Sequence, residues 1–210
     1  MKIGIIGSGN VGGTLGSRWA HAGHTVTFGT RNRVSPEITA LLESAPGSRA
    51  ATSQEAAAEC DVILLSTPWP ATREILASVG SLAGKVVIDA TNPLLPGLAG
   101  LEVGTDNSAA ELVASWAPGA RVVKAFNTIG SNIMANPDFG GSRALLFYCG
   151  DDADAKATVH ALATEIGFDA EDAGPLKNAR LLEPFAMLWI SRAFTPGHGG
   201  EFAFQILRRS

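Results

Sequence analysis

The sequence predicts an α/β fold built on a doubly wound, mainly parallel sheet with a small C-terminal α/β extension. Two observations predict the sheet. Short apolar runs alternate with helix-like segments along the chain, and the first run leads straight into a glycine-rich turn. The chain has 210 residues, and 46% of them are hydrophobic, so it has enough apolar side chains for a substantial core.

The first strand and the turn after it carry the most information. Residues 2–6, KIGII, are apolar, and GSGNVG at 7–12 follows them directly and opens a helix-like stretch. In this Rossmann-type arrangement the glycines permit a tight turn, a close approach of pyrophosphate, and close packing of helix on strand. The N–H groups and the dipole at the helix start favour an anion. The alternative is a structural glycine turn. We expect these residues to bind a dinucleotide: Gly7, Ser8, Gly9, Asn10, Val11 and Gly12.

The second expected strand, residues 24–29, ends at a cationic segment. An NAD enzyme places an acidic residue near this point to bind the ribose hydroxyls, but no acid occurs between Thr25 and Pro36. The positions hold Thr30, Arg31, Asn32 and Arg33 instead. Because a guanidinium binds a ribose phosphate and a carboxylate repels it, we expect NADP(H). The alternative is a pair of solvated surface arginines.

Further buried strands are expected at 61–66, 85–89, 121–126 and 144–149, because these runs are almost continuously apolar. A helix is expected at 154–166 and a short strand near 168–172. Residues 97–104 are glycine-rich and are expected to form a mobile surface loop, whereas 201–207 alternate like a strand.

Three of the buried strands end in small polar residues or proline. Because ligands of parallel sheets bind beyond the carboxyl ends of the strands, we expect these residues to border the cofactor. Ordinary turn chemistry is the alternative. The expected residues are Ser66, Thr67, Pro68, Ala90, Thr91, Asn92, Asn127 and Thr128.

The stretch 179–190 is apolar on almost every side, which predicts a buried helix in the core or at a subunit interface. Met187 and Trp189 on this helix either pack in the core or form the wall of a pocket for a flat ring. We expect a second-ligand pocket made by Trp69, Asn127 and Met187.

The sequence offers poor candidates for acid–base catalysis. We expect His21, His24 and His160 at the surface, His198 in a flexible loop, and Lys124 and Lys177 in solvated positions. Hydride transfer between two rings depends on alignment and exclusion of water, so we assign no catalytic residue. No cluster has metal-ligand spacing, and we expect no metal.

Composition excludes several partners. The net charge of −4 argues against nucleic acid, and no apolar run is long enough to span a bilayer. We expect no signal peptide, because the sequence opens on an expected strand, and its two cysteines, Cys60 and Cys149, fit no metal or redox spacing. We therefore expect free thiols and a cytoplasmic protein. The charged fraction of 17% is low, which favours burial of apolar surface against a second subunit or a large ligand.

Several of these segments together resemble a known family over nearly the whole chain. The opening GSGNVG, Ser66-Thr67-Pro68, Asp89 to Pro93 and Lys124 to Thr128 are similar to the NADPH-dependent reductases of coenzyme F420, an 8-hydroxy-5-deazaflavin. Thr30-Arg31 and the segment from Asn178 to Pro184 extend the likeness. The cytosolic oxidoreductase domain of the six-transmembrane metalloreductases, whose acceptor is a flavin, is also similar.

The resemblance implies hydride exchange between NADP(H) and a deazaflavin or flavin, in a homodimer. It implies that residues 1–140 form an NADP-binding Rossmann domain and that 141–210 help to close the cleft and the dimer interface. It also implies that the loops at Thr67-Pro68 and Thr91-Asn92 border the nicotinamide. Two alternatives stay open: an NADPH-dependent reductase of a small imine or carbonyl, and a non-catalytic NADP(H)-sensing module.

Overall fold

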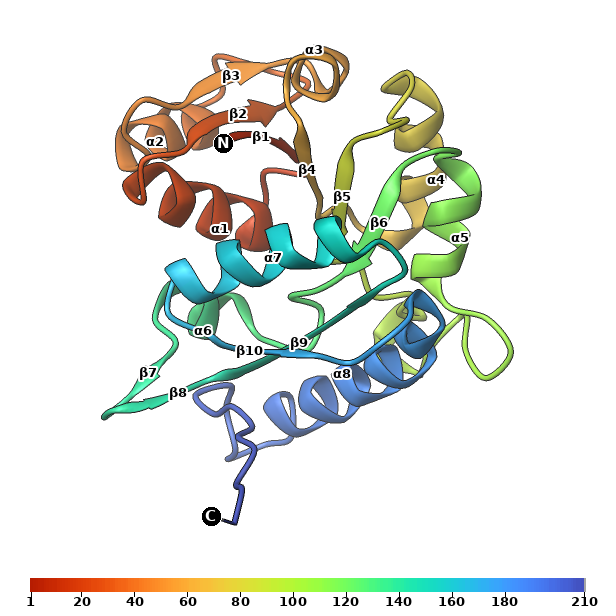
Figure 1. Cartoon of the computed structure of the whole chain (residues 1–210). Coiled ribbons are helices and arrows are strands. Elements are labelled where there is room, and N and C mark those ends of the chain that lie inside the picture. Colours follow the sequence, from red (N-terminus) through yellow and green to blue (C-terminus); the bar gives the residue numbers. More distant parts are fainter. Residues whose placement is uncertain (210) are drawn as a thin grey trace.

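A computed structural model describes residues 1–209 and places most strands in one eight-stranded sheet, in the order β10-β9-β6-β5-β4-β1-β2-β3 (Figure 1). A separate two-stranded hairpin pairs β7 with β8. The strands are β1 (Lys2–Ile6), β2 (Thr25–Gly29), β3 (Arg49–Ala51), β4 (Val62–Leu65), β5 (Val86–Asp89), β6 (Arg121–Lys124), β7 (Asp138–Phe139), β8 (Ser142–Arg143), β9 (Leu145–Gly150) and β10 (Asp169–Asp172).

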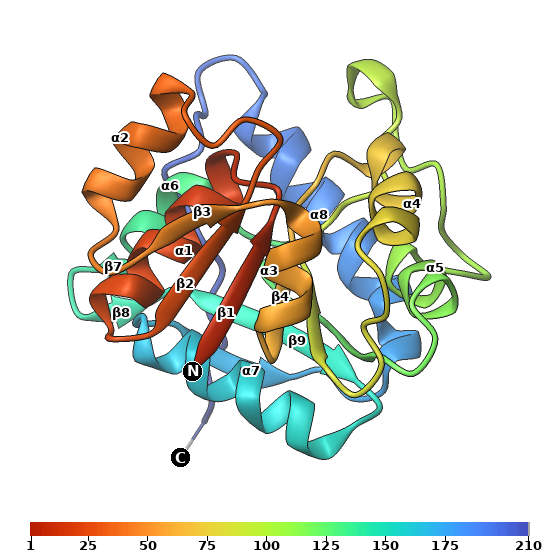
Figure 2. The ribbon, with the colours of Figure 1, turned by 90° about the horizontal axis from the view of Figure 1, so that it is seen from above.

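Helices connect the strands and cover both faces of the sheet. In the view from above, α1 and α2 lie on one side of the sheet and α4 and α5 on the other (Figure 2). The helices are α1 (Asn10–His21), α2 (Pro36–Ser44), α3 (Ser53–Glu59), α4 (Trp69–Ser78), α5 (Ala109–Trp116), α6 (Ser131–Ala135), α7 (Ala153–Glu165) and α8 (Ala179–Ala193), with short 3-10 turns η1 (Pro96–Leu98) and η2 (Leu176–Asn178). No helix among the described residues is long and apolar enough to cross a bilayer.

The core forms two layers because successive strand residues point to opposite faces. In β4, Val62 and Leu64 join the cluster under α1 and α7, whereas Ile63 and Leu65 join the cluster under α3, α4, α5 and α8. All four β4 residues are buried, as the continuously apolar runs of a doubly covered parallel sheet require. The predicted fold class is therefore confirmed.

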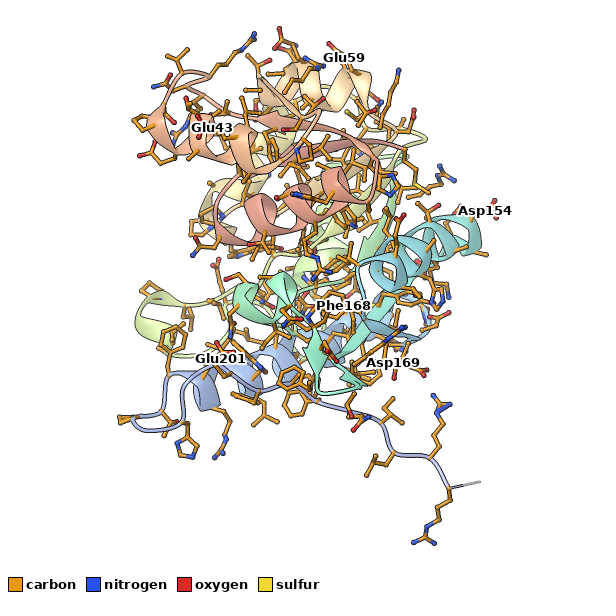
Figure 3. The ribbon with its side chains drawn as sticks, turned by 90° about the vertical axis from the view of Figure 1, so that its left-hand side faces the viewer. Glu43, Glu59, Asp154, Phe168, Asp169 and Glu201 are labelled. Atoms are coloured by element: carbon orange, nitrogen blue, oxygen red, sulfur yellow. The ribbon has the colours of Figure 1, made fainter. Side chains whose placement is uncertain are left out.

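The C-terminal part continues this sheet. After β6 the chain passes through α6 and the β7–β8 hairpin, and β9 then pairs antiparallel with β6. Helix α7 connects β9 to β10, which runs parallel to β9. The first helix is tied to this part: the Trp19 indole N–H donates to the Leu162 carbonyl of α7 at 3.1 Å, and Arg18 donates to the Ile166 carbonyl at 2.6 Å. Phe168, which is 1% exposed, fills the interior between these parts (Figure 3). The division at residue 140 stays a prediction.

One of two local expectations was wrong. Residues 201–207 are not a strand. This segment runs back along α8, near the Glu201 label in Figure 3. Its alternating apolar residues include Phe202, which packs on Trp189, and Phe204, which packs on Phe185. The segment 97–104 is a surface loop as expected, with η1 and a bridge between Leu94 and Leu101 at its start, and its mobility stays a prediction.

Candidate functional site

The glycine turn between β1 and α1 is shaped as its sequence requires. Gly7 has φ of 104°, which favours glycine, and a Cβ on Gly12 would lie 2.0 Å from the Gly7 carbonyl oxygen. Around Gly9 a Cβ would meet no atom within 4 Å, so the backbone there is open. Gly9 is also the N-cap of α1 and supplies no side-chain acceptor. The turn therefore presents uncapped N–H groups to an open space, which suits an anion.

A cavity of about 800 Å³ opens beside this turn. It lies at the carboxyl edge of β1, β2 and β4. Several predicted residues line it: Gly7, Ser8, Thr30, Arg31, Asn32, Thr67 and Pro68. Its other wall comes from the start of α3 and from α4, through residues that sequence reasoning missed: Thr52, Ser53, Gln54, Glu74, Ile75 and Ser78. The structure thus brings the glycine turn and the cationic segment after β2 to one cavity.

The two arginines of the cationic segment differ in their partners. The exposed Arg31 lines the cavity and makes no hydrogen bond or ion pair within residues 1–209. Arg33 instead forms an ion pair with Glu55 and does not line the cavity. Hydrogen bonds from the Thr52 backbone N–H, Arg33 and the Thr52 hydroxyl lower the pKa of Glu55 to about 2. Glu55 is the acidic partner in the capping box of α3, a signal visible in Thr52-Ser53-Gln54-Glu55.

The carboxyl ends of β5 and β6 form a second polar cluster. Asn92 and Asn127 exchange hydrogen bonds: the Asn92 amide donates to the Asn127 carbonyl at 2.8 Å, and the Asn127 amide donates to Asn92 Oδ1 at 3.2 Å. Asn127 also donates to the Leu182 carbonyl of α8 at 3.2 Å. Its Oδ1 is buried without a partner among the described residues. Phe126 just before it has φ of 65°, a strained conformation for an aromatic residue.

The prediction that Lys124 is solvated was wrong. Lys124 is 0% exposed, and its ammonium donates to Asp89 Oδ2 at 3.0 Å and lies 2.9 Å from Glu183 Oε1. Burial lowers the pKa of Lys124, but the charges of Asp89 and Glu183 outweigh burial, so its pKa is raised and the side chain is an ammonium. Sequence reasoning missed this triad because its members come from β5, β6 and α8.

The remaining predicted residues are spread around these two clusters. Ser66 holds the glycine turn through a 2.8 Å hydrogen bond from its hydroxyl to the Gly7 carbonyl. Trp69 is 8% exposed and stacks on Trp116, with 5.4 Å between ring centroids. Met187 is half-buried on α8. Neither Trp69 nor Met187 lines the cavity, and the second-ligand pocket stays a prediction.

The histidines lie away from the cavity. His24, expected at the surface, is largely enclosed: its ring nitrogens contact the Met1 ammonium at 2.8 Å and Glu165 at 2.7 Å. His160 and His198 are exposed. No group of three or more His, Cys, Asp or Glu side chains within residues 1–209 could hold a metal ion.

Known proteins resemble the chain in sequence. The profile of a family described as NADP oxidoreductase, coenzyme F420-dependent, matches residues 2–93. The F420-dependent NADP reductase of Methanothermobacter marburgensis is 35% identical over 206 residues, which cover 91% of this chain and 92% of that protein. Metalloreductase STEAP3 of Rattus norvegicus is 35% identical over 184 residues, 87% of this chain. The chain spans about a third of that longer protein, since the match covers 36% of it.

Solved structures share the fold. A crystal structure from Arthrobacter sp. FB24, assigned to the F420-dependent NADP reductases, has a TM-score of 0.89 and 31% identity and covers 99% of this chain and 100% of its own. A reductive aminase from Aspergillus terreus, in complex with NADPH and ethyl levulinate, has a TM-score of 0.67. It is 22% identical and covers 92% of this chain and 62% of its own, so this likeness concerns the fold alone.

Proposed function

The chain belongs to the family of coenzyme F420-dependent NADP oxidoreductases, and we propose that it transfers a hydride between NADP(H) and the deazaflavin coenzyme F420. The observation that carries this proposal is the match to F420-dependent NADP reductases over nine-tenths of the chain, 91%. When bound, NADPH would supply the hydride and the oxidised deazaflavin would gain it together with one proton from solvent; in the reverse direction NADP+ would accept the hydride and the reduced deazaflavin would lose that proton.

The residues of the cavity fit a dinucleotide with a phosphorylated ribose. The uncapped N–H groups at the start of α1 bind the pyrophosphate in this proposal, because they lie open at Gly9 and attract an anion. Thr30, Arg31 and Asn32 bind the ribose phosphate. Arg31 is suited to this because no carboxylate among the described residues engages its guanidinium. Arg33 joins them only after it releases Glu55.

The strand ends of β5 and β6 serve the nicotinamide end in this proposal. The loops at Thr67-Pro68 and Thr91-Asn92 border the ring in this proposal, together with Asn127. Thr91 and Asn127 are buried, and the amide hydrogens of Asn127 already bond protein oxygens. Rigid side chains of this kind hold one ring against another without an acid or base. Met187 and Trp69 are proposed to contact the acceptor.

We propose that the protein works as a cytoplasmic homodimer. Three large apolar side chains on α8 and directly after it are exposed: Leu181 (68%), Leu188 (51%) and Phe194 (71%). Contact with a second copy of the chain would remove them from water. Cys60 and Cys149 are buried free thiols, which suits a reducing compartment. Sedimentation of the wild type and of Leu188→Lys tests the dimer. A wild type that sediments as a monomer at micromolar concentration contradicts it.

The central experiment mixes the protein with NADPH and coenzyme F420 under anaerobic conditions. We expect the visible absorbance of the deazaflavin to bleach while NADPH is consumed in a one-to-one ratio. Parallel reactions replace coenzyme F420 with FAD or FMN and replace NADPH with NADH. Tight NADPH binding without bleaching refutes the proposed acceptor. Bleaching that is equally fast with NADH refutes the preference for the phosphorylated cofactor.

A further inference from the structure

Three charged side chains are sealed beneath the carboxyl ends of β5 and β6. Asp89, Lys124 and Glu183 are each 0% exposed. Burial of charge is costly, and hydrophobic side chains of similar volume are often as stabilising in such places. A buried ion triad is therefore weak evidence for a purely stabilising role. Its hydrogen bonds to the neighbouring loops indicate what else it does.

The first set of bonds holds the end of β5. Asp89 Oδ1 accepts from both the backbone N–H of Thr91 at 2.9 Å and the Thr91 hydroxyl at 2.7 Å. Lys124 donates to the Thr91 carbonyl at 2.7 Å. The side chain, N–H and carbonyl of Thr91 are thus all fixed by two members of the triad. Asn92 is the next residue, so the position of its amide depends on this arrangement.

The second set of bonds reaches α8 and α5. Glu183 contacts Lys124 with one oxygen and accepts from the first N–H groups of α5, Ala109 at 2.9 Å and Ala110 at 3.2 Å. The partial positive charge of these N–H groups, at the N-terminus of α5, partly compensates the negative charge of Glu183. The neighbouring residue Leu182 accepts the amide of Asn127.

A packing contact supports the same link between α8 and the loop after β6. Trp189, which follows Glu183 on the same helix, packs so closely on Gly130 that a Cβ there would lie 2.4 Å from the indole ring. The loop from Asn127 to Gly130 is therefore held by α8 at both ends.

We infer that Asp89, Lys124 and Glu183 are positioning residues that set the Asn92–Asn127 pair, and with it the nicotinamide ring, at the orientation needed for hydride transfer. The inference rests on the proposed function for the identity of the ligand. It assigns a role to a charged cluster that touches neither the cavity nor solvent. The adenosine end of the dinucleotide, at Thr30 and Arg31, lies outside the hydrogen-bond network of the triad.

The test uses amide variants that remove one carboxylate charge and leave the buried ammonium paired with the other carboxylate. Glu183→Gln leaves Lys124 paired with Asp89, and Asp89→Asn leaves it paired with Glu183, so both variants are expected to fold. Glu111→Gln is the matched control. It breaks the ion pair from Arg180 to Glu111, 2.7 Å long, which also joins α8 to α5 but has no bond to Thr91 or Asn127.

Three measurements separate a positioning role from a structural one. The Kd of 2′-phospho-ADP-ribose, which lacks the nicotinamide, is expected to stay within about twofold of wild type, because the adenosine site is intact. The emission of the reduced nicotinamide of bound NADPH is expected to change. The kcat with coenzyme F420 is expected to fall by about 10- to 100-fold, as for a small misplacement of reacting groups, with little change in KM for NADPH.

Hydrogen exchange gives a readout that needs no acceptor. Segments 89–93 and 124–130 are expected to exchange faster in both triad variants and to be unchanged in Glu111→Gln. If wild-type protein does not reduce coenzyme F420, the proposed function fails, but nicotinamide emission and hydrogen exchange still test the triad.

The inference is overturned if both triad variants keep wild-type emission, exchange and turnover. It is also overturned if Glu111→Gln matches their losses, if affinity for 2′-phospho-ADP-ribose falls as far as affinity for NADPH, or if neither amide variant folds.

Discussion

Arg31→Ala is expected to weaken NADPH binding far more than NADH binding. Arg31 lines the cavity beside the glycine turn and has no carboxylate partner within residues 1–209, so its charge is available to a ribose phosphate. A hydrogen bond to a charged group contributes about 1.5–3 kcal/mol. Loss of that energy corresponds to an increase in Kd of roughly 10- to 100-fold at room temperature. NADH carries no phosphate at this position and is expected to lose almost nothing.

Arg33→Ala is the matched comparison. Its guanidinium already donates to Glu55, and both side chains are about half exposed, 49% and 46%. An exposed ion pair, whether Arg33 makes it with Glu55 or with a phosphate of the cofactor, contributes about 0–1 kcal/mol of binding energy. We therefore expect Arg33→Ala to lower the affinity for NADPH less than about fivefold. Calorimetric titration of both variants with NADPH and NADH decides the matter. The reasoning is refuted if Arg31→Ala weakens both cofactors equally, or if Arg33→Ala has the larger effect.

Four other substitutions, one of Lys124, two in the glycine turn and one of Cys149, have expected outcomes. Lys124→Met leaves two buried carboxylates unpaired and is expected to reduce the free energy of unfolding in urea by about 3–5 kcal/mol; a loss below about 1 kcal/mol contradicts the charged triad. Gly9→Ala is expected to keep the wild-type melting temperature but bind NADPH weakly, whereas Gly12→Ala is expected to melt earlier because its Cβ would lie 2.0 Å from a carbonyl oxygen; equal melting of the two contradicts the turn geometry. Burial raises the pKa of the Cys149 thiol to about 12. The unfolded chain therefore loses this proton at a lower pH, about 8.5, than the folded chain does. The free energy of unfolding is expected to fall as the pH rises from there to about 12. Cys149→Ala is expected to make this alkaline decline in unfolding free energy shallower, and an unchanged slope contradicts the assignment.

Much of the fold could be predicted because the central strands β1, β4 and β5 are short, largely apolar and followed by a recognisable turn. The runs at 62–65 and 86–89 are strands within a few residues of their expected limits. The direction of β9 could not be predicted, because an apolar run has the same pattern in either direction. The three-residue strand β3 was missed since Arg49-Ala50-Ala51 carries no apolar alternation.

The site was predictable where its residues are neighbours in sequence. The glycine turn and Thr30 to Asn32 lie within the first β-α-β unit, and the structure brings them to one cavity. Lys124 looked solvated because its carboxylate partners are far away in sequence, with Asp89 35 positions earlier and Glu183 on the last helix. Arg33 was expected to bind the cofactor because the sequence shows Glu55 only as a helix-capping residue. It does not show that the Glu55 carboxylate also accepts a hydrogen bond from Arg33.

The ties from α1 to α7 have a consequence for how the chain is made. Trp19 emerges early from the ribosome, but the carbonyl that accepts its buried indole N–H belongs to Leu162. Until α7 has been synthesised, the indole N–H of Trp19 lacks this acceptor, although Phe126 and α6 already pack on α1. We therefore expect a nascent chain that stops before α7 to be a client of chaperones, and its release from them to coincide with the emergence of α7 from the exit tunnel.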